Sequence, residues 1–137
     1  MTGFLLVVKT AGHHEASSLC ERQRNIAKEA PSLNVKWYCV RCVFKRRDRP
    51  QYEERMTVWR AASFEAAIER AEAEALEYQA VSEFEYLRLA QAYDLKTSLI
   101  EDGSEIFSLI RTSALGPDEY INRFFDTGTE AQSPLEL

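Results

Sequence analysis

The stretch from residue 60 to residue 78, RAASFEAAIERAEAEALEY, constrains the fold more than any other part of the sequence. Its apolar residues recur at steps of four, three, four and three, which is the spacing of one face of an α-helix. They are Phe64, Ile68, Ala71, Ala75 and Tyr78. Ser63 stands directly before them and is a favourable N-cap. Because the stripe is narrow and its middle residues are small, we predict a helix that lies close against one face of a sheet.

Two segments before this helix have the composition of β-strands. Residues 35–44, VKWYCVRCVF, and residues 52–60, YEERMTVWR, are rich in β-branched and aromatic residues, and a polar turn with a proline separates them. We predict a hairpin in which Trp37 lies opposite Trp59, because this register gathers apolar residues on one face. The predicted core face holds Tyr38, Val40, Cys42, Phe44, Tyr52, Glu54, Met56 and Val58.

The remainder of the chain predicts a second hairpin and a second helix. Residues 84–92 fit either a strand or a continuing helix. An Asp-Gly pair at 102–103 lies between apolar runs, which is a strong hairpin signal, and residues 105–112, EIFSLIRT, follow as a strand. A Gly-Pro pair at 116–117 then begins a short helix. Its predicted buried side holds Tyr120, Ile121, Phe124 and Phe125.

These elements predict an α+β fold for residues 35–126. We expect an antiparallel sheet of about four strands, built from two β-hairpins, with helices packed on one face in the order ββαββα. Residues 1–34 are expected to form an N-terminal extension that is weakly structured or holds a short strand and a helix. Residues 127–137 are expected to form a loose C-terminal tail. A length of 137 residues fits one domain.

Composition excludes several classes of protein. The net charge of −5 disfavours a general nucleic-acid binder, which needs a basic surface. We find no apolar run near the ~20 residues that a membrane span requires, and residues 4–8 are too short for a signal-peptide core. Three cysteines do not describe a secreted disulfide scaffold. We therefore expect a cytoplasmic protein of a reducing compartment.

The sequence contains no pattern that identifies an enzyme. Cys39 and Cys42 have the C-x-x-C spacing of zinc or redox sites, but a strand directs these two positions to opposite faces, which favours ordinary packing. Nucleophile-elbow, zinc-protease, phosphate-loop and dinucleotide motifs are missing. We therefore predict no catalytic residue, no cofactor and no metal. Glu54 carries two alternatives: an exposed edge carboxylate paired with an arginine, or a buried carboxylate with a raised pKa at an active site.

Several segments resemble those of one bacterial family. They are WYCVR at 37–41, YEER at 52–55, RAASFEAAIERAEAEALEY at 60–78 and DGSEIFSLIR at 102–111. In this order they are similar to the family called domain of unknown function 4288, over about residues 36–126. The family name implies no activity, cofactor or catalytic residue. Some bacterial domains of this size are immunity or defence-associated proteins.

Charge is separated along the chain. Residues 63–85 hold seven acids and one base, whereas residues 41–60 hold seven bases and three acids. Glu65, Glu69 and Glu72 form one ridge of the predicted helix, where like charges are mildly unfavourable. Either this ridge is simply solvated, or its cationic partners come from the hairpin, a second copy of the chain or a basic protein.

We therefore predict a small non-catalytic protein-binding module, immunity-like or defence-associated, that recognises its partner through this charge-separated surface. The predicted contact residues are Glu65, Glu69, Glu72, Arg46, Arg47, Arg49, Trp37 and Trp59. One alternative is a nucleic-acid or nucleotide binder that uses the basic hairpin with exposed tryptophans as stacking surfaces. Another is an enzyme centred on Glu54. A sheet edge or the tryptophan face is a candidate surface for a homodimer.

Overall fold

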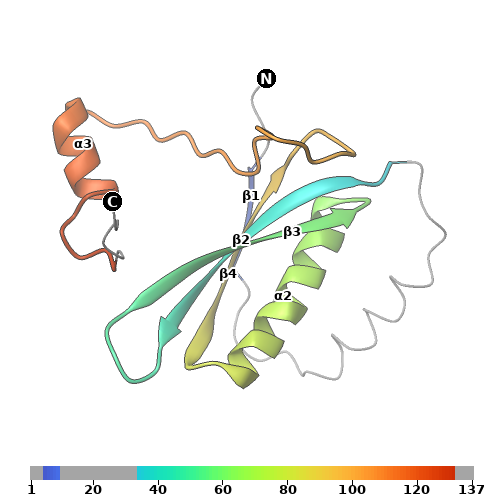
Figure 1. Ribbon diagram of the computed structural model, residues 1–137, viewed down its shortest axis with the longest axis horizontal. Helices are drawn as coiled ribbons and strands as arrows, with labels where there is room; N and C mark the ends of the chain where they lie inside the picture. The colour runs from blue at the N-terminus through green and yellow to red at the C-terminus, as the bar shows by residue number, and fades with distance from the viewer. Residues whose placement is uncertain (1–4, 10–33, 132–137) are drawn as a thin grey trace.

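The computed structural model describes residues 5–9 and 34–131 (Figure 1). Four strands form one antiparallel sheet in the order β1-β4-β2-β3. The α+β class and the antiparallel sheet are therefore as predicted, and the ambiguous segment at 84–92 is a strand. In chain order the elements are β1 (Leu5–Lys9), β2 (Lys36–Arg46), β3 (Tyr52–Ala61), α2 (Phe64–Val81), β4 (Phe84–Asp94) and α3 (Pro117–Phe124).

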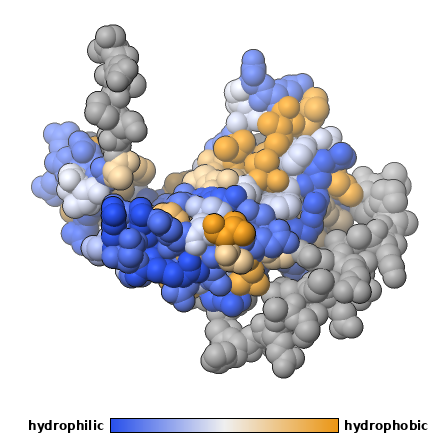
Figure 2. All heavy atoms as spheres, turned by 60° about the horizontal axis from the view of Figure 1, so that its bottom comes forward, coloured by the Kyte–Doolittle hydropathy of each residue, from blue (hydrophilic) through white to orange (hydrophobic). Residues whose placement is uncertain are grey.

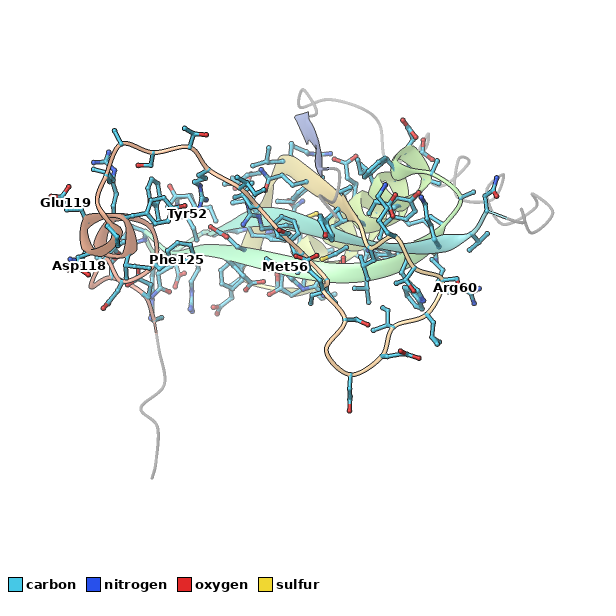
Figure 3. All side chains as sticks on the ribbon, turned by 90° about the horizontal axis from the view of Figure 1, so that it is seen from above. Tyr52, Met56, Arg60, Asp118, Glu119 and Phe125 are labelled. Atoms are coloured by element: carbon cyan, nitrogen blue, oxygen red, sulfur yellow. The ribbon has the colours of Figure 1, made fainter. Side chains whose placement is uncertain are left out.

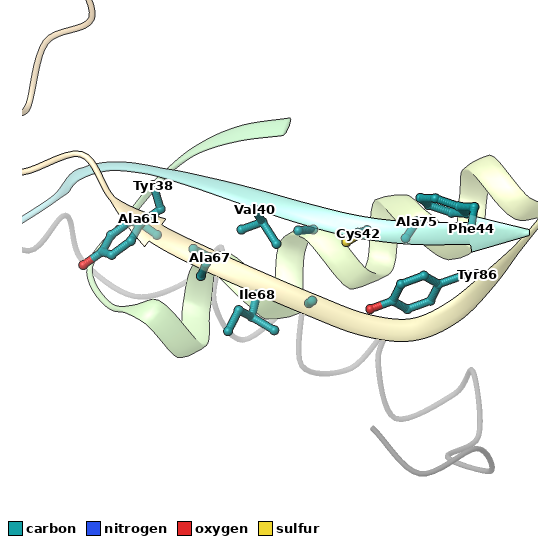
Figure 4. Packing of buried hydrophobic residues seen from close by; sticks show 12 residues of the cluster. Tyr38, Val40, Cys42, Phe44, Ala61, Ala67, Ile68, Ala75 and Tyr86 are labelled. Carbon is teal, nitrogen blue, oxygen red and sulfur yellow. The ribbon is translucent and has the colours of Figure 1, made fainter. Parts of the chain in front are cut away.

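Helix α2 covers one face of the sheet. The Ser63 Oγ accepts a hydrogen bond from the Ala66 N–H at 3.1 Å, which confirms the predicted N-cap. The predicted apolar stripe packs against the strands, and its small side chains let the helix lie close to them (Figure 4). The shared core consists of Tyr38, Val40, Cys42, Phe44, Ala61, Ala67, Ile68, Ala71, Ala75, Tyr86, Ala90 and Ala92.

The predicted hairpin of β2 and β3 forms, but its register differs by one residue. Trp59 lies opposite Tyr38, and Trp37 lies opposite Arg60. A shift of one residue exchanges the two faces of a strand. The half of the predicted core face on β3 is therefore wrong, and Tyr52, Glu54, Met56 and Val58 lie on the face opposite α2.

The reason for this error is that β3 is an edge strand. Its α2 side carries Arg55, whose guanidinium carbon lies 4.3 Å from the centroid of the Tyr78 ring. The Tyr78 hydroxyl also donates a hydrogen bond to Glu53 at 3.2 Å. Long polar side chains at an edge cover apolar surface with their stems and keep their charged ends in water. Counting apolar residues on each face therefore selects the wrong register here.

The predicted second hairpin does not form. The turn at 102–103 is present, since Ser104 N–H donates to the Glu101 carbonyl at 3.0 Å and Gly103 has a φ of +82°. Residues 105–112, however, are not a strand. Strand β4 has β2 on one side and β1 on the other, so neither edge of β4 is free to take them. Residues 95–131, which we call the C-terminal arm, leave the sheet after β4.

Part of the C-terminal arm lies on the sheet face opposite α2. The Phe107 ring packs on the Tyr93 ring, with centroids 5.9 Å apart, and the Tyr93 hydroxyl donates to Glu105 at 2.7 Å. This hydrogen bond and partial burial raise the pKa of Tyr93 to about 12. These contacts hold the first half of the arm against β4 without any strand pairing.

Helix α3 begins at Pro117, directly after Gly116, as predicted. Its side chains are not buried, so the predicted buried side of α3 is wrong. Its rings pack on one another instead, with centroids 4.7 Å apart between Tyr120 and Phe124. Figure 1 shows α3 away from the sheet, at the end of an extended stretch of the arm, so one helix and not two packs on the sheet.

Two further predictions concern the ends of the chain. Residues 127–131 include a closed turn, in which the Glu130 carboxylate accepts hydrogen bonds from the N–H groups of Thr127 and Gly128, at 2.9 and 3.1 Å. Residues 132–137 and the helix predicted before residue 34 lie outside the described residues.

Among the helices that the structure describes, none has the length and apolarity needed to cross a bilayer.

Strand β4 contains a bulge opposite β2. Cys42 pairs with Ala90, but Phe44, two residues on, pairs with Tyr86, four residues back. Strand β4 thus has two surplus residues at this point, and Arg88 within the bulge has a φ of 61°. Because the surplus is an even number, Tyr86 and Ala90 both face α2.

Candidate interaction surface

The acidic ridge predicted on α2 does not act as a single surface. The Glu72 carboxylate accepts a hydrogen bond from the buried Tyr86 hydroxyl at 2.9 Å. Burial, and then the neighbouring Cys42 and Glu72, raise the pKa of Tyr86, so its hydroxyl stays protonated as the donor. Glu65 is exposed and Glu69 is half-buried, and neither forms an ion pair within residues 34–131. The three ridge carboxylates therefore differ in their surroundings, since Glu72 is engaged with the core and Glu65 is exposed.

Cationic partners of α2 come partly from the hairpin, which was one of the predicted sources. Arg55 of β3 forms an ion pair with Glu74, with Nη1 and Oε2 2.5 Å apart. Arg70, a base within α2, turns away from the acidic residues. Its guanidinium donates to the Arg60 carbonyl at 2.6 Å and lies 5.0 Å from the Trp59 ring centroid. The helix is thereby tied to β3 at two places.

Arg47 was predicted to bind a partner. Its side chain instead caps the C-terminal end of helix α2. Its guanidinium donates to the carbonyl oxygens of Ser82 and Gln79, at 2.7 and 3.0 Å, and its backbone N–H donates to the Glu83 carbonyl at 3.0 Å. The last carbonyls of a helix have no partner within the helix, and a cation is favourable beside them. Arg47 therefore joins the hairpin tip to the end of α2.

The other arginines of the hairpin tip also have partners within the chain. Arg46 donates to Asp48 at 2.9 Å and forms a second ion pair with Glu83. Arg49 is exposed and lies 3.5 Å from Asp48. The tip therefore presents much less unpaired positive charge than its sequence implies.

The two tryptophans do not share a stacking surface. Trp59 lies on the α2 side, partly buried, and its Nε1–H donates to the Thr57 hydroxyl at 2.7 Å. Trp37 lies on the other face, opposite Arg60, whose guanidinium carbon is 6.0 Å from its ring centroid. The one-residue change in register separates them, because it places positions 37 and 59 on opposite faces.

Glu54 is not a buried carboxylate, so that alternative for this residue is wrong. Its side chain is 63% exposed, and its Oε2 lies 3.3 Å from Nη1 of Arg41. Arg41 also donates from Nε to Gln91 at 2.8 Å, and its guanidinium carbon lies 4.8 Å from the Phe107 ring centroid. This matches the alternative of an edge carboxylate paired with an arginine.

The C-x-x-C cysteines are separated by the sheet. Cys42 faces α2 and Cys39 faces the opposite side, and both are buried free thiols. Burial raises the pKa of Cys39 to about 11 and that of Cys42 to about 12, so both thiols are poor nucleophiles and metal ligands at neutral pH. Where the structure describes the chain, no group of His, Cys, Asp and Glu side chains could hold a metal ion.

A polar hollow of about 490 Å³ lies where β2 begins and β4 ends. It is lined by Asn34, Val35, Lys36, Tyr38, Ala62, Lys96, Thr97 and Ser98. Beside it, the buried Asp94 binds the Nζ atoms of Lys36 and Lys96, at 2.7 and 3.3 Å. Burial raises the pKa of Asp94, but hydrogen bonds from Lys36 and from the backbone and side chain of Lys96 outweigh it and lower the pKa. This carboxylate offsets part of the positive charge of the two lysines.

Exposed apolar side chains gather on α3 and on the face of β3 opposite α2. On α3 and its C-cap they are Ile121, Phe124 and Phe125, and on β3 they are Tyr52, Met56 and Val58. Figure 3 shows these two regions, with Tyr52 and Met56 on β3 and Phe125 at the C-cap of α3. In the view of Figure 2, hydrophobic residues form patches set among hydrophilic ones. Such patches are typical of surfaces that contact another protein.

Sequence reasoning missed two features of this surface. The buried Asp94 carries no local signal, because its partner Lys36 is 58 residues away. The apolar residues of α3 were identified, but their exposure was not, since an amphipathic pattern is the same whether the apolar side meets its own chain or another. No family model, curated protein or solved structure matches the chain. The resemblance to domain of unknown function 4288 therefore stays a prediction.

Proposed function

We propose that this protein is a non-catalytic module that binds another protein, with α3 as the recognition element. The observation that carries the proposal is the exposure of the apolar side chains of α3 at the end of the C-terminal arm. Ile121 and Phe124 of α3 and Phe125 at its C-cap are 49%, 40% and 55% exposed. Helices with exposed apolar side chains at this spacing bind in apolar grooves of partner proteins.

The side chains of α3 also indicate the chemistry of the partner. Asp118 and Glu119 lie in the first turn, next to the apolar residues. We expect a groove with apolar walls and with basic residues at the rim that meets this first turn. The guanidinium carbon of Arg111 lies 5.0 Å from the Phe124 ring centroid, so the arm supports the helix from one side. An immunity-like or defence-associated protein that masks a basic target is one biological form of this proposal.

Three observations weigh against the alternatives. A nucleic-acid binder would use Arg46 and Arg47, but both are engaged with the end of α2 and the residues after it. Stacking on both tryptophans would require them on one face, and they lie on two. An enzyme centred on Glu54 would require a closed pocket around a carboxylate that is in fact exposed.

A photo-crosslinking amino acid at Phe124, in the full chain expressed in its native host, tests the proposal. We expect a discrete crosslinked partner from Phe124 and none from the matched position Val81, which is more exposed but belongs to α2. Asp118→Lys with Glu119→Lys should weaken the crosslink, whereas Glu65→Lys with Glu69→Lys should not. Equal crosslinking from Val81, or loss of the crosslink through the α2 substitutions alone, would contradict recognition by α3.

A further inference from the structure

Strand β3 lies at one end of the sheet, and among the described residues one of its edges has no paired strand. β2 pairs with one side of β3. On the other side, no described segment forms a backbone-to-backbone hydrogen bond with residues 52–61. Long free edges invite pairing with another strand, and natural proteins often block them with charges or bulges. Within β3 the charges lie at residues 53–55 and 60, and residues 56–59 carry none.

The hydrogen-bond pattern shows which residues of β3 offer their backbone to this edge. Near the turn, Arg46 N–H donates to the Gln51 carbonyl at 2.8 Å, and hydrogen-bonded pairs recur at every second position of an antiparallel ladder. Thr57 is six positions from Gln51 and therefore directs its N–H and carbonyl toward β2. Met56 and Val58 direct theirs toward the free edge.

The Arg60 carbonyl supports this assignment. Arg60 has the same parity as Met56 and Val58, and its carbonyl accepts a hydrogen bond from the Arg70 side chain and not from β2. Its N–H points the same way and meets no backbone acceptor among the described segments. A second strand along this edge would therefore find both donors and acceptors at residues 54, 56 and 58, and a donor at the N–H of Arg60.

The sequence of β3 is complementary to itself about Thr57. Glu54 lies three residues before Thr57 and Arg60 lies three after it, and Met56 and Val58 flank it. When two copies of β3 pair antiparallel with Thr57 at the centre, Glu54 of each lies opposite Arg60 of the other. Met56 of each then lies opposite Val58 of the other. All four positions face away from α2, and Met56 and Val58 are 43% and 40% exposed.

Other symmetric registers lack this match. A centre at Met56 places Glu54 opposite Val58, and a centre at Val58 places Met56 opposite Arg60. A centre at Arg55 places two guanidinium groups against each other. Opposite charges and apolar pairs across strands each contribute about 0.2–1 kcal/mol, and like charges are unfavourable. The register about Thr57 is therefore the favoured one.

We propose that the free edge of β3 is a homodimer interface, in which two copies pair about Thr57 to form one continuous eight-stranded antiparallel sheet, four strands from each copy. A two-fold axis through the sheet relates the copies, as in most dimers. Both α2 helices then cover the same face. The occupant of this edge is a second copy of the chain, and this interface is separate from the α3 surface.

Charge exchange between positions 54 and 60 tests this proposal. We expect the full-length protein to dimerise in sedimentation analysis, and Glu54→Lys or Arg60→Glu to weaken the dimer about tenfold, since each replaces two attractive pairs with repulsive ones. An equimolar mixture of the two variants should form a heterodimer tighter than either variant's homodimer, although Glu54→Lys also loses its pair with Arg41 of the same chain. In that heterodimer the lysine introduced into one copy meets the glutamate introduced into the other, and the native Arg60 meets the native Glu54. Six residues of strand span about 20 Å, so this rescue cannot arise within one chain.

A monomeric unsubstituted protein, or a dimer that neither substitution weakens, would overturn the proposal, as would a mixture no tighter than its components. Circular dichroism establishes that each variant is folded. If the charge variants do not fold, Thr57→Cys replaces them. At the centre of the pairing the two Cα atoms would lie about 4.5 Å apart, within reach of a disulfide. Mild oxidation should then give a covalent dimer that the unsubstituted chain does not form, and its absence would overturn the proposal.

Discussion

The two faces of the sheet use their apolar residues in opposite ways. On the α2 face, aromatic and aliphatic side chains interlock, and Phe44 is fully buried between the rings of Tyr78 and Tyr86. On the other side, the C-terminal arm places Phe107 against the sheet but leaves Ile110 and Phe125 largely in water. Apolar side chains therefore have two outcomes: on one side they form the core of the fold, and on the other several of them stay exposed.

The topology explains this difference. Helix α2 follows β3 directly and crosses back over the sheet before β4, so the chain itself brings its apolar stripe onto that face. The arm leaves β4 when both edges of that strand are already paired. It can rest on the sheet through side chains but cannot join the ladder, and its last helix receives little support.

The largest expected effect is a loss of stability on the packed α2 face of the sheet. Phe44→Ala should lower the free energy of unfolding by about 3–5 kcal/mol, because it opens a cavity among closely packed rings. The matched substitution Phe124→Ala removes the same atoms from α3 and should cost less than about 1 kcal/mol. Urea denaturation of both variants measures this. Similar losses would show that α3 contributes to the core of the fold.

A second expected effect concerns the junction between sheet and arm. Asp94→Asn removes the charge that binds Lys36 and Lys96, and hydrogen bonds to charged groups contribute about 2 kcal/mol. The pKa of Asp94 is lowered in the folded protein, so its stabilisation is present above the unfolded pKa of about 3.9 and is lost as the pH falls through the folded pKa. Denaturation at several pH values should show the two proteins converging below about pH 4. A constant difference across this range would exclude the carboxylate charge as the cause.

The smallest expected effect concerns the end of α2. Arg47→Met removes the two hydrogen bonds to the Ser82 and Gln79 carbonyls and should lower the free energy of unfolding by about 1 kcal/mol, since the site is exposed. Hydrogen exchange should become faster in the last turn of α2. Arg49→Met, at the neighbouring exposed arginine, is the control and should change stability by less than about 0.5 kcal/mol. Equal effects of both substitutions would mean that stability depends on the positive charge of the hairpin tip and not on the hydrogen bonds to the carbonyl oxygens.

The sequence predicted the elements of the packed side well, because periodicity and capping are local properties. Ser63 as N-cap, the stripe from Phe64 to Tyr78 and the two long strands at 36–46 and 52–61 are all present. The register between the strands was wrong by one residue, because it depends on Arg55 reaching across to Glu74 and Tyr78. Such a contact between a strand and a helix has no local pattern in the sequence.

The candidate interaction surface was predicted less well, because it depends on which groups are left without an internal partner. Charge counts identified Arg47 and Glu72 as candidate contacts, but both are occupied within the chain. The failure of residues 105–112 to become a strand could not be predicted either, since it follows from β1 occupying the far edge of β4. Both results depend on contacts between segments that are distant in the chain.

The bulge in β4 has a consequence for changes in chain length. Its two surplus residues sit where Arg88 holds a backbone conformation that favours glycine or asparagine. Deleting two residues here would restore an unbroken ladder and leave Tyr86 facing α2, whereas deleting one would turn every side chain before the bulge to the wrong side. Insertions and deletions at this point of the gene should therefore be tolerated in pairs of codons and rejected singly.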